Sequence, residues 1–365
     1  MLACALLGGA IAAWAQTSDT TNTNQSWTAT TQSQQFTAGS QARTVHSHTQ
    51  SGNHTIDKQS IQLLRSGTYE PYQDIEREST QVDSSTTRTE IRTYGRDVNG
   101  GRVLVQVTTE ENKTLPGGGS KVVHSTSNPD ANGNLLLVQR QVQDTTKVNK
   151  NVEESKTTTY LPDVNGGLQP AMQVQERREH VDDHTVQFQK STLLPDGAGN
   201  WQTGEVKTGT ITDTGTGHSS EEHVLRPDSE GYLGEVSRTI TRESQSVSGE
   251  NRSTVEDYAQ DVPGASSDGS LHLVQRVMTR QQSSSTGQAI QQQVEQINPG
   301  DPSAGLQVTV LSSGSKEEGA SGSRESRTFE VRDANGHLNV VSVDMTKSDQ
   351  TPPVKVQITP PAKSK

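Results

Sequence analysis

The feature that most constrains the fold is a turn motif, running from an aspartate to a glycine, that recurs about every 33 residues. The closing glycines stand at positions 100, 133, 166, 199, 231, 269, 305 and 336, so the successive gaps are 33, 33, 33, 32, 38, 36 and 31 residues. A fixed period of this size is typical of proteins in which one supersecondary unit is copied along the chain. The sequence therefore predicts a repeat architecture.

The units share one internal layout. A large apolar residue stands two positions after the closing glycine, as at Leu135, and a valine usually stands five positions after it, as at Val138. Alternating apolar and polar residues on both sides of a polar stretch predict two strands joined by a loop. Strict alternation breaks between these two positions, so we expect a β-bulge after the turn.

These patterns predict an all-β fold, an antiparallel meander of about eight 33-residue strand–loop–strand repeats. The repeats would form an extended sheet or a solenoid-like array, and a β-propeller-like closure is the alternative. Apolar residues gather near the aspartate–glycine turns, whereas the opposite loops are polar. We therefore expect a buried seam, a row of buried apolar side chains, along the turn side, and solvent-exposed loops at the opposite side.

The chain divides into five parts on composition. Residues 1–15 are predicted to be a signal peptide, because residues 2–13 are apolar and small and an Ala-Trp-Ala cleavage site follows. Residues 16–40 are predicted to be a disordered polar spacer, and residues 41–90 a diverged N-terminal β repeat that caps the array. Residues 91–348 form the β-hairpin repeat array, and residues 349–365 a disordered tail rich in proline and lysine.

Charge and aromatic content exclude some partners. The chain has 43 carboxylates against 32 lysines and arginines and only three tryptophans, six tyrosines and three phenylalanines. The chain has too few basic residues to neutralise nucleic-acid phosphates and too few aromatic residues to stack on bases. We therefore expect no nucleic-acid partner. The same shortage of aromatic residues, with strands rich in Gln, Thr and Arg, argues against an outer-membrane barrel. We therefore expect no transmembrane span.

The turn motif has two readings. In a type I turn the aspartate accepts hydrogen bonds from backbone amides ahead of it, and glycine takes a positive φ at the fourth position. The alternative is calcium binding, because Asp-x-Asn-Gly overlaps the start of known calcium loops, but only two oxygen ligands per turn are present. Turn chemistry is favoured, and no metal or other cofactor is predicted. The calcium candidates are Asp97, Asn99, Asp130, Asn132, Asp163, Asn165, Asp333 and Asn335.

Three other groups of residues are candidate sites. The pair His180 and His184 is interpreted as part of a solvated strand end or loop rather than a metal site. The group of His46, His48 and His54 has no carboxylate near it in sequence, which disfavours a metal there as well. A third group recurs seven residues after the closing glycine and could bind a polyanion, but pairing with nearby glutamates is favoured. Its members are Arg140, Arg238 and Arg276.

No catalytic motif is present, so the sequence predicts a protein that is not an enzyme. The leading functional hypothesis is a secreted or surface-associated, repetitive structural or adhesive protein, because repetition suits multivalent weak binding. The alternative is an extracellular module that binds polysaccharide or another polymer, with calcium as a potential requirement. Either partner would be an extracellular polymer or a second copy of the chain. The expected location is secreted, which covers the periplasm, the cell surface and the extracellular space.

Overall fold

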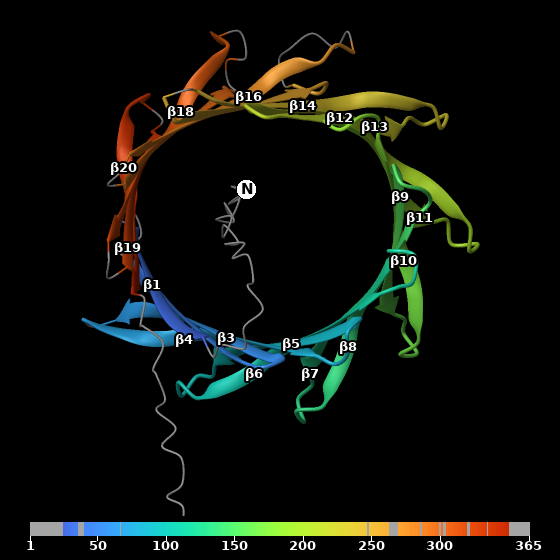
Figure 1. Cartoon of the computed structure of the whole chain (residues 1–365), viewed down its shortest axis with the longest axis horizontal. Coiled ribbons are helices and arrows are strands. Elements are labelled where there is room, and N and C mark those ends of the chain that lie inside the picture. Colours follow the sequence, from blue (N-terminus) through green and yellow to red (C-terminus); the bar gives the residue numbers. More distant parts are fainter. Residues whose placement is uncertain are drawn as a thin grey trace, which may run out of the picture.

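The computed structural model describes residues 25–35, 40–65, 67–246, 248–262, 269–284, 287–298, 301, 304–319, 322–333 and 335–349. The predicted signal peptide and nearly all of the predicted C-terminal tail lie outside these residues. Within them the chain folds into one sheet that curves into a ring (Figure 1). No helix in the described part is long and apolar enough to cross a membrane.

Twenty strands are present in the described residues, and each is 10 to 14 residues long. They are β1 (Gln25–Gln35), β2 (Ser40–Ser51), β3 (His54–Arg65), β4 (Thr68–Gln81), β5 (Thr86–Arg96), β6 (Arg102–Thr114), β7 (Ser120–Pro129), β8 (Leu135–Lys147), β9 (Val152–Pro162), β10 (Leu168–His180), β11 (Thr185–Pro195), β12 (Trp201–Thr214), β13 (Gly217–Pro227), β14 (Leu233–Gln245), β15 (Glu250–Ala259), β16 (His272–Ser284), β17 (Gly287–Ile297), β18 (Leu306–Gly319), β19 (Gly322–Arg332) and β20 (Leu338–Asp349).

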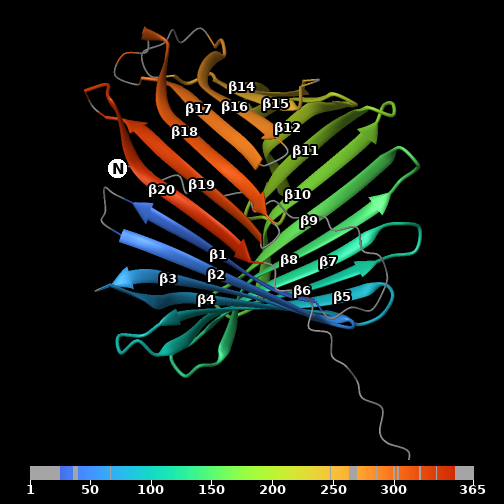
Figure 2. The ribbon, with the colours of Figure 1, turned by 60° about the vertical axis from the view of Figure 1, so that its left-hand side comes forward.

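The sheet closes on itself. Each strand pairs antiparallel with the next in sequence, and β1 also pairs with β20, with Gln32 opposite Met345. Figures 1 and 2 show the result as a single barrel. Closure removes both free sheet edges, so every strand has a partner on each side. The predicted antiparallel meander is confirmed, whereas the solenoid and propeller arrangements are wrong.

The closing strand also corrects the predicted domain plan. Strand β1 occupies residues 25–35, inside the segment predicted to be a disordered spacer. The spacer prediction rested on a composition rich in Thr, Ser, Gln and Asn. Those residues bury little apolar surface. Their backbone groups can nevertheless form hydrogen bonds with an unpaired strand edge on each side. The edges of β2 and β20 supply that pairing.

The turn prediction is confirmed at atomic detail. At Asp97 the carboxylate Oδ1 accepts hydrogen bonds from the amides of Asn99 (2.8 Å) and Gly101 (2.7 Å). The carbonyl of Asp97 accepts one from the amide of Gly100 (3.0 Å), whose φ is +79°. The same carboxylate pattern recurs at Asp130, Asp163, Asp196, Asp228 and Asp333.

The predicted bulge also exists, and its position is nearly constant. In β8 the register shifts around Val138, five residues after Gly133, and in β6 it shifts around Val105, five after Gly100. Hairpin β3–β4 shows the same spacing, with Gly67 at φ +82° and the shift around Tyr72. A bulge adds local twist and bends a strand. The hairpins flare outward from the ring, as Figure 1 shows around its circumference.

In the described residues the wall is one sheet thick, and no second layer covers it. The apolar side chains that are buried among the described residues are all valines, and they are spread around the ring rather than gathered in a core. They are Val107, Val152, Val206, Val224 and Val262. The predicted buried seam on the turn side is therefore absent. The fold rests on continuous backbone pairing and on side-chain contacts along each face.

Candidate functional surfaces

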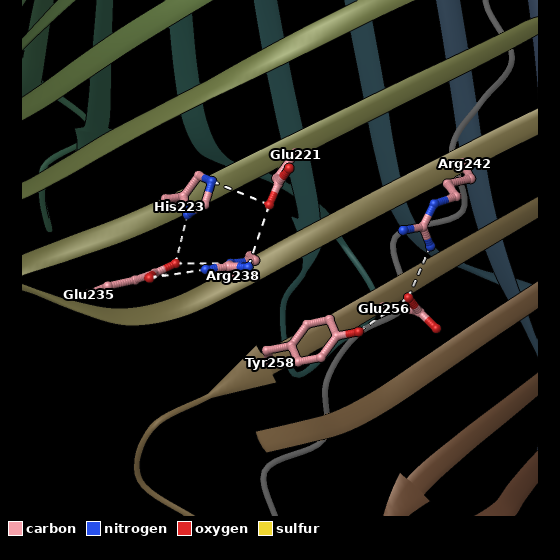
Figure 3. Close-up of polar contacts among 7 residues, drawn as sticks. All are labelled: Glu221, His223, Glu235, Arg238, Arg242, Glu256 and Tyr258. Atoms are coloured by element: carbon pink, nitrogen blue, oxygen red, sulfur yellow. Dashed lines mark hydrogen bonds and ion pairs between the residues drawn. The ribbon is translucent and has the colours of Figure 1, made fainter. Parts of the chain in front are cut away.

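Strand register divides the side chains of the wall into two sets. Residues directly opposite each other in an antiparallel pair project from the same face, and neighbours along a strand project from opposite faces. Arg238 is opposite both His223 and Tyr258. Figure 3 views this wall from outside, with the opposite wall behind it, and these side chains lie in front of the ribbon. Every residue in register with them therefore belongs to the outer face.

The outer face carries networks of ion pairs. His223 lies between two carboxylates, with Nδ1 2.7 Å from Glu235 and Nε2 3.4 Å from Glu221. Arg238 closes the ring of four, at 3.1 Å from Glu235 and 3.6 Å from Glu221 (Figure 3). This closed set of alternating charges links β13 and β14.

A second network spans four strands, from β14 to β17. Glu256 on β15 accepts hydrogen bonds from Arg242 on β14 (3.1 Å), from Arg276 on β16 (3.0 Å) and from the Tyr258 hydroxyl (3.3 Å). Arg276 also reaches Glu295 on β17, at 3.5 Å. The prediction that Arg238 and Arg276 pair with nearby glutamates is confirmed. Both arginines lie on the outer face, in the middle of these networks.

The inner face is lined mainly by hydroxyl and amide side chains. Thr239 donates to Asp257 across β14 and β15 (2.7 Å), and Gln296 donates to Gln275 across β16 and β17 (2.9 Å). Gln292 donates to Thr279 at 3.4 Å on the same pair of strands. These residues alternate with the outer-face residues along each strand, so they project toward the centre of the ring. Such side chains offer both donors and acceptors to a polar solute.

Ion pairs on the inner face lie between neighbouring strands. Lys207 contacts Glu222 at 2.9 Å, and His124 lies 3.8 Å from Glu110. His48 lies 2.5 Å from Asp57. The two residues are nine positions apart in sequence, and the pairing of β2 with β3 places them opposite each other. His46 lies on the same face, opposite Gln59 of β3. His54 belongs to the other face, where it contacts Glu78 at 2.8 Å.

The other predicted residues lie at the ends of strands. His180 ends β10 and His184 directly precedes β11, as expected, and the amide of His184 donates to Asp182. The calcium candidates lie in the turns. There Oδ1 of Asp130 and Oδ1 of Asp163 each accept hydrogen bonds from two backbone amides. Amide donation from Asn134 and from Gly167 lowers the pKa of these two carboxyls respectively. Calcium binding at the turns stays a prediction that the geometry does not test.

One surface was missed by sequence reasoning. All the aspartate–glycine turns join an odd-numbered strand to the next even-numbered one, so they lie at the same end of the barrel. Most of the exposed large apolar side chains in the described residues lie within five residues of those turns. We call this surface the apolar rim. It consists of Tyr72, Val98, Val103, Val105, Leu135, Leu136, Leu161, Val164, Leu194, Tyr232, Leu233, Val331 and Val340.

The rim has a signal in the sequence that went unused. All six tyrosines of the chain stand close to the turn end of a strand or in a turn, and Trp201 begins β12 at the same end. They are Tyr69, Tyr72, Tyr94, Tyr160, Tyr232 and Tyr258. Aromatic residues are few in this chain, but their positions along the strands are informative.

Comparisons with known proteins define the fold class. No family model and no curated protein sequence matches the chain. Among solved structures it is similar to the siderophore receptor PirA from Acinetobacter baumannii, with 7% identity, a TM-score of 0.50, and coverage of 90% of this chain and 81% of that one. The copper transporter OprC (7% identity, TM-score 0.44, 90% and 80% covered) and OccK5 from Pseudomonas aeruginosa (10%, 0.40, 89% and 97%) are more weakly similar.

The fold is therefore that of an outer-membrane β-barrel, and several predictions need correction. The secreted structural or adhesive protein, and the polymer-binding alternative, are wrong as predictions, because the barrel fold is shared with a siderophore receptor. The expectation of no transmembrane span fails for the same reason, since such barrels cross the membrane with strands. That receptor is not described as an enzyme, and it fits the cell-surface part of the predicted location but not secretion.

Proposed function

We propose that this chain forms a conduit of the cell envelope, in which polar solutes move through the lumen of the barrel. The observation that carries the proposal is the closed ring, in which β1 pairs with β20. A sheet of this many strands encloses an interior too wide for its own side chains to fill. A closed wall around such a space defines a passage.

The lining of the lumen supports polar cargo. The inner face presents threonine, serine and glutamine side chains such as Thr239, Thr279 and Gln296, and they hydrogen-bond across neighbouring strands. These groups replace the hydrogen bonds that a polar solute loses with part of its hydration shell. Envelope location is supported by the fold shared with outer-membrane barrels.

Conductance with site-directed blocking tests the proposal. The chain, with Cys4→Ser as background, is reconstituted into planar bilayers. Thr279→Cys places a thiol on the inner face, and Arg280→Cys places one on the outer face of the same strand. A bulky charged thiosulfonate reagent should reduce the conductance of Thr279→Cys and leave that of Arg280→Cys unchanged.

Two outcomes would contradict the conduit. A folded barrel that gives no conductance above protein-free bilayers has no passage for ions. Equal blocking at the two positions would mean that the current does not run through the lumen. Arg280 is a suitable control because it is 58% exposed and its ion pair with Glu250 is superficial, so its loss changes stability little.

A further inference from the structure

We propose that the inner wall from β15 to β19 binds an extended peptide that has uncharged side chains and a free carboxylate at one end. This inference rests on the proposed conduit and names a class of solute that its lumen would take. The first observation is a row of valines. Val277 is two residues from Thr279, so it projects from the same inner face. Strand pairing places four more valines in line with it, directly opposite one another across five strands. The valine row consists of Val255, Val277, Val294, Val310 and Val331.

Two rows of polar side chains run beside the valine row on the same face. The row nearer the aspartate–glycine turns consists of Asp257, Gln275, Gln296 and Gln307. The row on the other side consists of Ser253, Thr279, Gln292 and Ser312. Amide and hydroxyl groups both donate and accept hydrogen bonds. Asp257 is the one charged residue in the three rows, and it already accepts a hydrogen bond from Thr239 (2.7 Å).

The three rows match an extended peptide that lies flat on the wall. Such a chain projects its side chains above and below the backbone, and its N–H and C=O groups point out along both edges. Side chains directed at the wall would pack on the valines, while both backbone edges would face amides and hydroxyls. A sugar ring would instead need an aromatic platform, and no position of the valine row is aromatic.

The valine row also differs from the inner face of the strands before it. On β9 and β10, Glu153 is opposite Arg178, and on β12 and β13, Lys207 contacts Glu222 at 2.9 Å. Charged side chains therefore line that part of the lumen. Between β15 and β19 the valine row contains no charge, so a ligand with uncharged side chains fits there best.

Two buried polar atoms at one end of the row indicate the carboxylate. Among the described residues, only the hydroxyl oxygen of Ser312 and Nε of Arg327 are buried side-chain nitrogen or oxygen atoms without a hydrogen-bond partner. Ser312 is 4% exposed and lies two residues from Val310, and Arg327 lies four residues from Val331 on the same face. Buried groups left unpaired are costly. A carboxylate accepts hydrogen bonds from both groups and carries the charge opposite to that of arginine.

Calorimetric titration of the full chain in detergent micelles tests the valine row. The probe is acetyl-Ala-Val-Ala-Val-Ala with a free C-terminal carboxylate. Val277→Thr with Val294→Thr keeps the side-chain shape and should weaken binding about tenfold, because two apolar contacts are lost. The matched control is Val122→Thr with Val174→Thr, which makes the same change at two half-buried valines of the inner face on β7 and β10. The control should bind the peptide as tightly as the native chain.

A second comparison tests the carboxylate end. Arg327→Gln should weaken binding of the free-carboxylate peptide about tenfold. The same peptide with a C-terminal amide should bind the native chain and Arg327→Gln equally. Equal weakening of both peptides in Arg327→Gln would overturn the assignment of the carboxylate to this end.

Three further results would overturn the site itself. They are equal losses in the valine-row variant and its control, no binding of the peptide to the native folded chain, and row-dependent binding of maltopentaose in place of the peptide. Titration in micelles needs no current across a bilayer. Conductance without peptide binding would remove this inference alone, whereas peptide binding without conductance would leave the site and remove the conduit.

Discussion

At the residue scale, the turn is determined by two side chains and a backbone angle. Aspartate satisfies two amides with one oxygen, and glycine adopts a conformation that other residues reach only with strain. These requirements are local, which is why the motif could be read from sequence with its geometry. The bulge five residues later was predictable for the same reason, because a broken alternation appears within one strand.

The glycine requirement can be measured. Gly133 has φ +84°, and a Cβ there would meet no atom within 4 Å, so Gly133→Ala introduces backbone strain without a clash. We expect the free energy of unfolding to fall by about 1–2 kcal/mol, as measured by urea denaturation. Gly234→Ala is the matched control, since that site is equally open and lacks a positive φ. A loss as large at Gly234 would refute the assignment of the cost to the turn angle.

At the scale of elements, neighbouring strands are joined by polar contacts in place of a core. The networks around Arg238 and Glu256 involve five consecutive strands on the outer face, from β13 to β17. Sequence alone suggested that the arginines pair with glutamates, but it could not say which ones. The partners lie 3 to 20 positions away in sequence, and only the strand register selects them.

The contribution of one such contact to the free energy of unfolding depends on how far the contact is buried. Glu256 is 12% exposed and accepts three hydrogen bonds, whereas Glu111 is 42% exposed and is paired with a still more exposed Arg88. Glu256→Ala should therefore destabilise the barrel by about 1.5–3 kcal/mol, and Glu111→Ala by less than about 1 kcal/mol. Thermal unfolding followed by circular dichroism compares them. Similar losses for the two variants would show that these networks contribute no more than isolated surface pairs.

At the scale of the whole molecule, closure is the decisive property. It converts a repetitive sheet with two free edges into a tube with an inside and an outside. Strands β1 and β20 are about as far apart in sequence as the chain allows. No local sequence pattern in either strand identifies the other as its pairing partner. The same local pattern is compatible with an open sheet, which is why the sequence favoured the wrong architecture.

A cross-link tests closure directly. Thr31 and Thr346 are opposite in the register of β1 and β20, so Thr31→Cys with Thr346→Cys should form a disulfide on mild oxidation. Thr31→Cys with Ser342→Cys is four positions out of register and should not. Both are made in the Cys4→Ser background and analysed by peptide mass spectrometry. An open barrel would give no bridge in either variant.

The sequence by itself determined what depends on near neighbours, namely the antiparallel hairpins, the turn at each Asp-x-x-Gly and the bulge after it. The tertiary structure decided the rest. Only closure separates Thr239, which lines the lumen, from Arg238 beside it on the outer face. Only the shared direction of the hairpins gathers Val98, Val164 and Tyr232 into one exposed rim. A period-two pattern fixes alternation between faces, but which face becomes the interior depends on how the whole sheet curves.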